Sequence, residues 1–236
     1  MSQEFKTLFE YLKNLRSRYF HALSAFYIYE GLLELSAPNI IGTKEAEENV
    51  KTLSRFKNFF IMSKEALRVY FFLELAKLFD ESKQSLHINK IVNFAGSNIK
   101  SLSKNDFLEF HQGRTFISEL FKQYKAIDKN DLIEIKNKIK KHEKTIKKLD
   151  DYRNQYLAHE DKKKKQISIN SGEIQNLFKL IADILNLFSS RLDFSTTMYS
   201  HVEKECKEDT KRVVDYLKRF EPYRLKEIEK KYNLGK

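Results

Sequence analysis

The sequence predicts an all-α protein built from long helices, and three observations carry that prediction. Only six Gly and two Pro occur in 236 residues, which leaves few turn signals. Hydrophobic residues make up 41% of the chain, enough for a core. Several segments repeat their apolar residues every three or four positions, as a helix with one buried face does. We find no internal repeat and no convincing strand.

The N-terminal third is expected to form two long helices. The first covers residues 3–35, where the apolar residues follow helical spacing. Pro38 and Gly42 indicate a turn, and Thr43 is a candidate N-cap for a second helix that runs to about residue 82. The phenylalanines near the end of that helix are expected in the core: Phe71, Phe72 and Phe79.

Polar side chains at capping positions predict where the later helices begin. Asp128 opens the longest charged helix, which is expected to reach about Ala158. A helix to about Leu192 and a basic helical tail complete the chain. The other candidate caps are Asn89, Ser103 with Asp106, and Asn170 with Glu173.

Charge and cysteine content narrow the class of function. The formal net charge is +11, and residues 130–165 hold eleven Lys and one Arg against seven acids. This excess suits a polyanion, and it equally fits a solvated lysine-rich helix face. The one cysteine, Cys206, forms no internal disulfide, and no zinc-ligand spacing occurs, so neither metal nor cofactor is expected. No signal peptide or membrane-spanning stretch is found, and a cytoplasmic location is expected.

The helix that Asp128 opens contains a regular apolar seam. Continuing its count leads to Arg153 and Tyr156, so the sequence places an arginine on the inward face. His142, within the seam, is interpreted as a core histidine. The seam residues are spaced 3, 4, 3, 4 and 3 positions apart: Leu132, Ile135, Ile139, His142, Ile146 and Leu149.

An inward arginine needs a compensating negative charge, because an unpaired buried charge costs several kcal/mol. The partner is either an acidic side chain, such as a buried Glu, or a bound phosphate. His159 follows Arg153 by six residues, so on a continuous helix the two lie about 120° and about 9 Å apart. Two copies of the segment brought together would give two Arg and two His, sufficient for RNA cleavage by the substrate's own 2′-hydroxyl.

The Arg/His spacing alone is a weak signal, because it occurs twice. "RSRYFH" runs from Arg16 to His21 inside a continuous predicted helix, and these two residues are interpreted as structural or surface residues. The second copy adds a polar Asn154 directly after its arginine, a position at a helix end and four lysines just beyond. These additions favour the second copy as the site.

The segment "YRNQYLAHED", with Arg153, Asn154 and His159, resembles the signature of the HEPN (higher eukaryotes and prokaryotes nucleotide-binding) superfamily. The order "VYFFLELAKLFDES", "SLHINKIVN" and then the charged helix is most similar to its AbiU-type, abortive-infection branch, over roughly residues 45–200. The resemblance implies an antiparallel helical bundle that forms a homodimer through the motif helices. It also implies a metal-independent endoribonuclease, often a toxin or antiviral effector. Asp161 stands where related toxins carry a tyrosine, so control by nucleotidylation of that tyrosine is not expected.

The resulting hypothesis is one HEPN-like domain over residues 1–236, with an N-terminal helix to 42, a core over 43–200 and a basic tail from 201. Arg153, His159 and Asn154 are the candidate catalytic residues. The partners expected are RNA, a second copy and an antitoxin or other defence protein, with no membrane. The alternative is an inactive HEPN-like module that binds RNA or protein. The candidate RNA-binding residues are Tyr156, Lys162, Lys163, Lys164 and Lys165.

Overall fold

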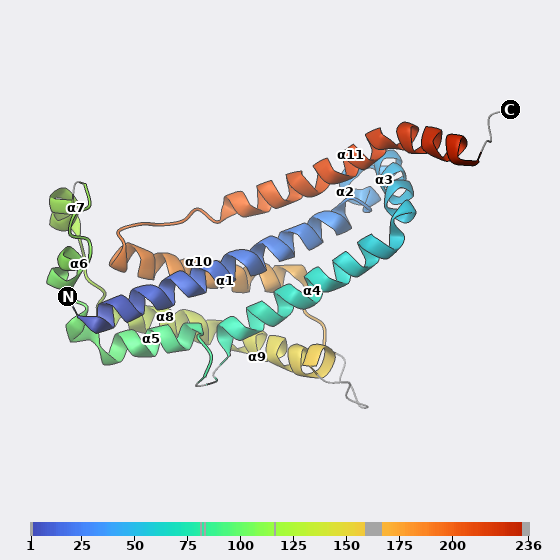
Figure 1. The fold of residues 1–236 in the computed structure, drawn as a ribbon. Coiled ribbons are helices and arrows are strands. Elements are labelled where there is room, and N and C mark those ends of the chain that lie inside the picture. The colour runs from blue at the N-terminus through green and yellow to red at the C-terminus, as the bar shows by residue number, and fades with distance from the viewer. Residues whose placement is uncertain (1, 81, 83, 116, 159–166, 233–236) are drawn as a thin grey trace. The chain divides into compact units, whose positions relative to one another are not determined.

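All regular structure in the described part of the chain is helical, which confirms the predicted all-α class (Figure 1). The computed structural model describes residues 2–80, 82, 84–115, 117–158 and 167–232, and for residues 156–158 it describes the backbone. Within the part formed by residues 1–22 and 71–199, long helices run alongside one another in opposite directions (Figure 1). Of the helices described, none combines the length and apolar character needed to cross a membrane.

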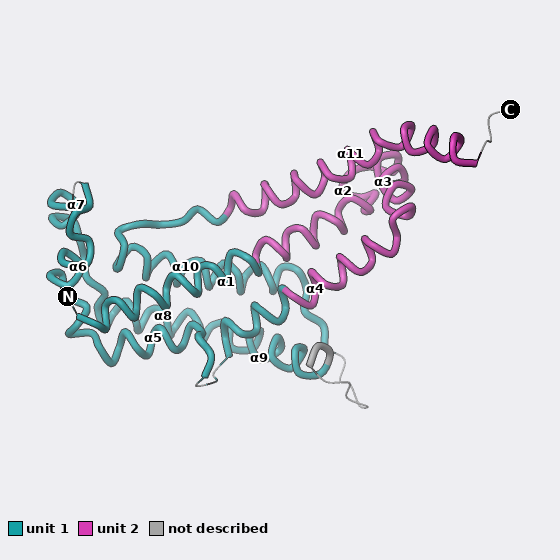
Figure 2. The backbone as a smooth tube through the Cα atoms, viewed as in Figure 1, with its two compact units in different colours: residues 1–22, 71–199 teal, residues 23–70, 200–236 magenta. Residues whose placement is uncertain are grey.

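The chain divides into two compact units (Figure 2). Both units are discontinuous in sequence, because helices α1 and α4 each contribute residues to both. The single domain with a core over 43–200 therefore remains a prediction, and the compact units have different limits. Unit 1 comprises residues 1–22 and 71–199, and unit 2 comprises residues 23–70 and 200–236.

Helix α1 spans Gln3–Glu34, which confirms the first predicted helix. Its start is fixed by Ser2, whose N–H donates to Asp106 (2.9 Å) and whose hydroxyl donates to the Ser101 carbonyl (2.7 Å). In unit 1 the helix buries a row of side chains at the predicted spacing: Phe5, Leu8, Leu12, Leu15 and Tyr19. This row is the inward face of α1.

The second predicted helix is broken, and its predicted cap is wrong. A short α2 (Pro38–Ile41) precedes α3 (Thr43–Arg55), which is followed by α4 (Lys57–Phe79). The N-cap of α3 is Gly42, with φ +88°, and Thr43 is already the first helical residue. The break is at Phe56, where the backbone leaves helical geometry (φ −116°, ψ 33°) and the chain turns between α3 and α4 (Figure 1).

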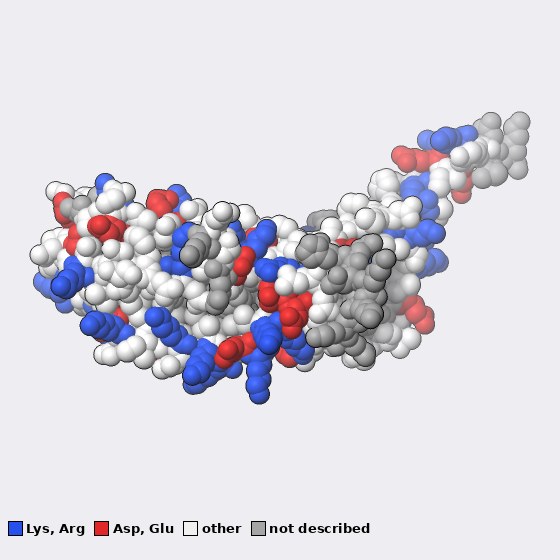
Figure 3. Space-filling model, turned by 90° about the horizontal axis from the view of Figure 1, so that it is seen from below, with Lys and Arg blue, Asp and Glu red and all other residues white. Residues whose placement is uncertain are grey.

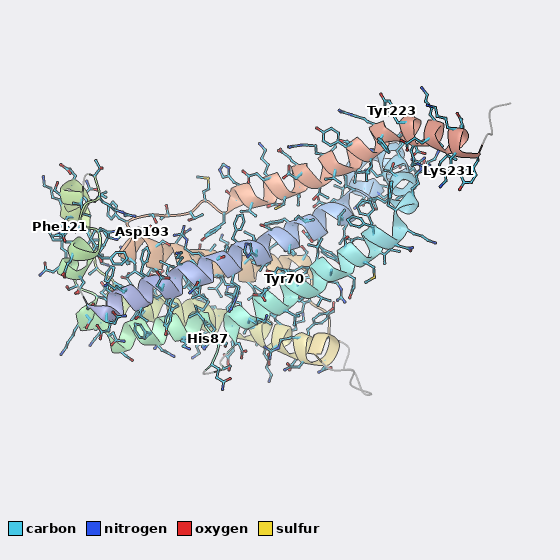
Figure 4. All side chains as sticks on the ribbon, viewed as in Figure 1. Tyr70, His87, Phe121, Asp193, Tyr223 and Lys231 are labelled. Carbon is cyan, nitrogen blue, oxygen red and sulfur yellow. The ribbon has the colours of Figure 1, made fainter. Side chains whose placement is uncertain are left out.

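Helix α5 (Ile88–Ser97) is capped by His87 and not by Asn89 as predicted. The Nδ1 atom of buried His87 accepts a hydrogen bond from the Lys90 N–H (3.2 Å), the role usually taken by Ser, Thr, Asp or Asn (Figure 4). The helices that follow in sequence are a 3₁₀ turn (Ile99–Ser101), α6 (Lys104–Phe110) and α7 (Ile117–Gln123). The predicted capping box of Ser103 and Asp106 is confirmed at the start of α6.

The charged segment that Asp128 opens is two helices and a π-helical turn, not one helix. Asp128 and Asp131 form a capping box at the start of α8 (Lys129–Lys141). The helix ends at His142, whose backbone lies at φ −102° and ψ 6°, and α9 (Glu143–Tyr152) begins directly after it. His142 is half-exposed at this break, so its interpretation as a core histidine is wrong.

The two C-terminal helices agree with the prediction. Helix α10 (Ser171–Leu192) begins with the predicted capping box of Asn170 and Glu173 and supplies ten buried residues, most of them apolar. Helix α11 (Ser200–Tyr232) continues through Pro222. This helix forms residues 201–232 of the predicted basic tail.

Candidate functional site

The candidate site lies where the helix type changes. Helix α9 ends at Tyr152, and the backbone of Arg153–Ala158 forms a π-helical turn. Such turns are rare in proteins, and those that do occur lie frequently at functional sites. The prediction of a continuous α-helix to Ala158 is therefore wrong here, and the angle of about 120° expected from α-helical geometry between Arg153 and His159 does not apply.

The turn before Arg153 is held firmly against α4 within unit 1. Leu149 is buried, and the ring of Tyr152 lies 4.6 Å from the ring of Phe72 on α4. Phe72 in turn stacks on Phe71 at 4.6 Å. Phe71, Phe72 and Phe79 are buried, as predicted. This aromatic contact fixes the backbone from which the arginine side chain extends.

Arg153, Asp150 and Asn154 form a closed ring of polar contacts. The Arg153 Nη2 atom pairs with the Asp150 Oδ1 atom at 2.6 Å, and the Arg153 Nε–H donates to the Asn154 Oδ1 atom at 3.1 Å. The amide of Asn154 closes the ring by donating to the Asp150 Oδ2 atom at 3.3 Å. The ring holds the plane of the guanidinium in one orientation.

A second carboxylate approaches the same arginine from the end of α4. The Asp80 Oδ2 atom lies 3.8 Å from the Arg153 Nη1 atom, and the Asp80 Oδ1 atom accepts a hydrogen bond from the Ser82 N–H (3.2 Å). The charge of Arg153 is therefore compensated by acidic side chains, which is one of the two predicted alternatives. The acids are two aspartates and not a buried Glu. The Arg153 side chain is 21% exposed, so it remains open to water.

Arg153 forms part of the wall of a cleft of about 340 Å³ in unit 1. Its lining combines apolar side chains with three carboxylates and two cations. This lining alone has an excess of negative charge, which disfavours a phosphate until further positive charge is added. The lining residues are Ala76, Phe79, Asp80, Glu143, Ile146, Lys147, Leu149, Asp150 and Arg153.

The predicted seam is buried only at its two ends. Leu132, Ile135 and Leu149 are buried, whereas Ile139 and Ile146 are half-exposed. The middle of the seam opens into a second cleft of about 350 Å³, which shares three residues with the first. It is lined by Phe79, Asn89, Lys136, Ile139, Lys140, Glu143 and Ile146. A half-exposed apolar strip thus remains in the single chain, and its Ile146 end lines the same cleft as Arg153.

The lysines of α8 and α9 form a solvated face that is partly neutralised by acids. Lys and Arg side chains gather along part of the face shown in Figure 3, interspersed with Asp and Glu. Lys148 contacts both carboxylate oxygens of Glu173 (2.8 and 2.9 Å), and this hydrogen bonding, with that of the Asn170 N–H, lowers the pKa of Glu173. Lys138 pairs with Glu134 at 2.8 Å.

Of the predicted site residues, the structure brings Arg153 and Asn154 together. His159 and Lys162, Lys163, Lys164 and Lys165 lie outside the described residues, and Tyr156 is described by its backbone alone. The competing pair behaves as predicted. Arg16 is half-buried and donates to the Thr197 hydroxyl at 2.7 Å, and His21 is exposed on continuous α1.

Sequence reasoning missed both aspartates. Asp150 lies three residues before Arg153, a spacing at which side chains on a helix meet, so the signal was present. Asp80 had no such signal, because only the packing of α4 against α9 brings it to the site.

Comparison with known proteins identifies the family. The HEPN family model described as AbiU2 matches residues 5–213, and it extends further in both directions than the resemblance over residues 45–200. No curated protein and no solved structure gives a significant match. Because the model covers most of the sequence, including α1 and the first part of α11, the chain belongs to the AbiU2 family of HEPN proteins.

Proposed function

We propose that this protein is a metal-independent endoribonuclease that acts as a toxin or an antiphage abortive-infection effector. The observation that carries the proposal is the position of Arg153. It stands at an α-to-π junction, on the wall of a cleft, with its guanidinium oriented by Asn154 and Asp150. Membership of an HEPN family supports the same role.

Arg153 is proposed to bind the scissile phosphate. Its planar guanidinium presents two parallel N–H groups to two phosphate oxygens. In the free protein those positions are taken by the carboxylates of Asp80 and Asp150. When a phosphate replaces them, the Asn154 oxygen still holds the Arg153 Nε–H and so keeps the guanidinium oriented, and the arginine stabilises the extra negative charge of the transition state.

His159 is proposed to transfer protons at the reacting atoms. One His159 takes the proton of the 2′-hydroxyl, whose oxygen attacks the adjacent phosphorus. The bond between phosphorus and the 5′-oxygen breaks, and a second histidine donates a proton to that leaving oxygen. The products are a 2′,3′-cyclic phosphate and a 5′-hydroxyl. A chain with one such histidine needs its equivalent from a second chain.

We therefore propose a homodimer in which two copies of the motif face each other. The half-exposed strip at Ile139 and Ile146 supports this arrangement, because Ile146 lines the same cleft as Arg153 and a second copy would remove the strip from water. Light scattering at micromolar concentration is expected to give the mass of a dimer. A mass corresponding only to monomer contradicts the two-histidine mechanism but not the fold.

RNA is proposed to be held by Lys162, Lys163, Lys164, Lys165 and Tyr156. The negative excess of the cleft lining makes these four lysines important, because they would reverse the sign of the charge near Arg153. We also propose that the protein acts in the cytoplasm and that an antitoxin or another defence protein is its partner.

The second candidate is a catalytically inactive module that binds RNA or protein. One observation favours it: the Nε, Nη1 and Nη2 atoms of Arg153 all face oxygen atoms of the protein. If those contacts are too strong to exchange, the arginine stabilises the fold and binds no phosphate.

A cleavage reaction in EDTA separates the two candidates. The purified protein is incubated with a mixed RNA substrate, and the ends of the products are determined. The nuclease is expected to cut in EDTA and to leave a 2′,3′-cyclic phosphate. Binding without cleavage supports the inactive module, and cleavage that EDTA stops contradicts the metal-independent mechanism.

A further inference from the structure

Helix α11 carries a straight stripe of basic and aromatic side chains that the proposed active site does not use, and the two kinds alternate over its first four residues. The residues follow one another at intervals of 4, 3, 4, 3 and 4, so they lie on one face of the helix, about 5 Å apart along its axis. All six are exposed. The stripe consists of Arg212, Tyr216, Arg219, Tyr223, Lys226 and Lys230.

The two tyrosines of the stripe present large exposed rings. Tyr216 is 59% and Tyr223 is 65% exposed, and Figure 4 labels the second of them. The Arg219 guanidinium lies 5.7 Å from the centre of the Tyr216 ring, and Phe220 (50% exposed) lies beside Tyr223 with the two rings nearly parallel. Exposed rings flanked by cations are the components with which proteins bind single-stranded nucleic acid.

The charge on this face changes sign at a sharp boundary. Before Arg212 the exposed acids nearest the line of the stripe are Glu205, Glu208 and Asp209, and Asp209 pairs with Arg212 at 3.3 Å. From Arg212 onward the stripe contains four bases and no acid. Two acids outside the stripe are paired, since Asp215 contacts Lys218 and Glu221 contacts Arg224 and Arg55, and the exposed Glu227 and Glu229 also lie outside the stripe. The stripe is thus a local basic strip and not an average property of a charged helix.

We propose that this stripe binds single-stranded RNA, with bases stacked on Tyr216 and Tyr223 and phosphates next to the cations. Single-stranded RNA alternates base and phosphate, as the first four residues of the stripe alternate cation and ring. A second copy of α11 is a poor occupant, because pairing two stripes would bring eight cations together. The inference rests on the proposed function, which supplies RNA as the ligand and is assigned to the motif in unit 1.

The test measures the affinity for an unstructured oligouridine with 2′-O-methyl groups, which lacks the nucleophile and stays intact. Tyr216→Ala/Tyr223→Ala is expected to bind about tenfold or more weakly, since the loss of two stacking contacts together exceeds a factor of about ten. The matched control is Tyr232→Ala on the same helix. Tyr232 is 63% exposed and has Lys231 at 5.7 Å from its ring, but it lies on the opposite face.

A fluorescence measurement checks stacking directly, because the chain contains no Trp. Tyr223→Trp is expected to keep the affinity and to lose emission when the oligonucleotide binds, whereas Tyr232→Trp is expected to keep its emission. Arg219→Ser/Lys226→Ser is expected to flatten the salt dependence of binding. Lys204→Ser, at a lysine exposed on the acidic part of α11, is expected not to do so.

Equal affinity of Tyr216→Ala/Tyr223→Ala and Tyr232→Ala overturns the inference. If Tyr216→Ala/Tyr223→Ala forms a smaller oligomer than the parent but binds RNA equally well, the inference is also overturned, and the stripe is assigned to a contact between proteins. The proposed nuclease fails separately. If the parent cuts no RNA but the stripe variants lose affinity, RNA binding by the stripe is supported and the proposed nuclease is rejected. If the parent cuts RNA and the stripe variants bind it normally, the nuclease is supported and RNA binding by the stripe is rejected.

Discussion

Unit 1 contains two arginines, Arg16 and Arg153, that have a histidine five or six residues later in the sequence. The helix geometry around the two arginines and the groups that they contact are different. Arg16 lies in the middle of α1, a continuous helix, and donates to the neutral hydroxyl of Thr197 at 2.7 Å. Arg153 lies at the junction of an α-helix and a π-helical turn and contacts two carboxylates and an amide oxygen. Only the second arginine faces negative charges that a phosphate can replace.

The comparison teaches that an Arg/His spacing becomes a candidate site through its neighbours. A hydroxyl and a carboxylate both satisfy an arginine, but only the carboxylate occupies the position and the charge of a phosphate oxygen. The residues after Arg153 also follow π-helical geometry, so their angular spacing differs from that of an α-helix. Arg16 and His21 lie on a continuous α-helix and keep its ordinary spacing.

The largest difference between the two regions is expected from removing each arginine. Arg153→Ala is expected to slow RNA cleavage by about 10²–10³, the usual loss when one stabilising donor is removed from a transition state. Arg16→Ala is expected to cut normally and to lose about 1 kcal/mol of unfolding free energy with its hydrogen bond. Single-turnover cleavage and thermal unfolding measure the two effects. Equal cleavage by both variants would remove the distinction.

A smaller effect is expected from the lysines beyond the second arginine. Replacing Lys162, Lys163, Lys164 and Lys165 by Ser is expected to weaken binding of RNA by about tenfold or more. It should also reduce the slope of log affinity against log salt by about 3, because each phosphate contact on a single strand contributes about 0.7. Fluorescence anisotropy at several salt concentrations measures both. An unchanged slope would place these lysines in solvent.

The smallest effect tests the carboxylates themselves. Asp150→Asn keeps a hydrogen-bond acceptor for Arg153 but removes a charge that repels phosphate. Affinity for uncleavable RNA is therefore expected to rise about fivefold, since two like charges near 4 Å in water repel by about 1 kcal/mol. Thr197→Val, the equivalent change at Arg16, is expected to leave RNA affinity unchanged. Weaker binding by Asp150→Asn would mean that the acid serves only to hold the arginine in place.

The parts of the fold that the sequence predicts are those set by neighbouring residues. Ser103 with Asp106 and Asn170 with Glu173 form the predicted capping boxes, because both partners lie in the same turn. The helix break at His142 had a local signal that the seam count passed over. Basic residues close α8 and Glu143 opens α9, which is the arrangement that suits the dipoles of two separate helices.

Other features depend on contacts between distant segments and were missed for that reason. No Pro or Gly marks the break at Phe56 in the sequence. The break arises because α3 packs as a separate helix, which buries Ala46, Asn49 and Thr52. At the site, Arg153 and Asn154 were predictable from the motif. Asp80 was not, because α4 and α9 are far apart in the sequence.

The central claim is that the second Arg/His segment, and not the first, cuts RNA. Its most direct test compares single-turnover cleavage by His159→Ala and His21→Ala under the same conditions, with circular dichroism and light scattering to confirm that both keep the parent fold and mass. Loss of proton transfer is expected to slow His159→Ala by about 10²–10⁴, while His21→Ala cuts like the parent. Cleavage by His159→Ala at the parent rate would contradict the account.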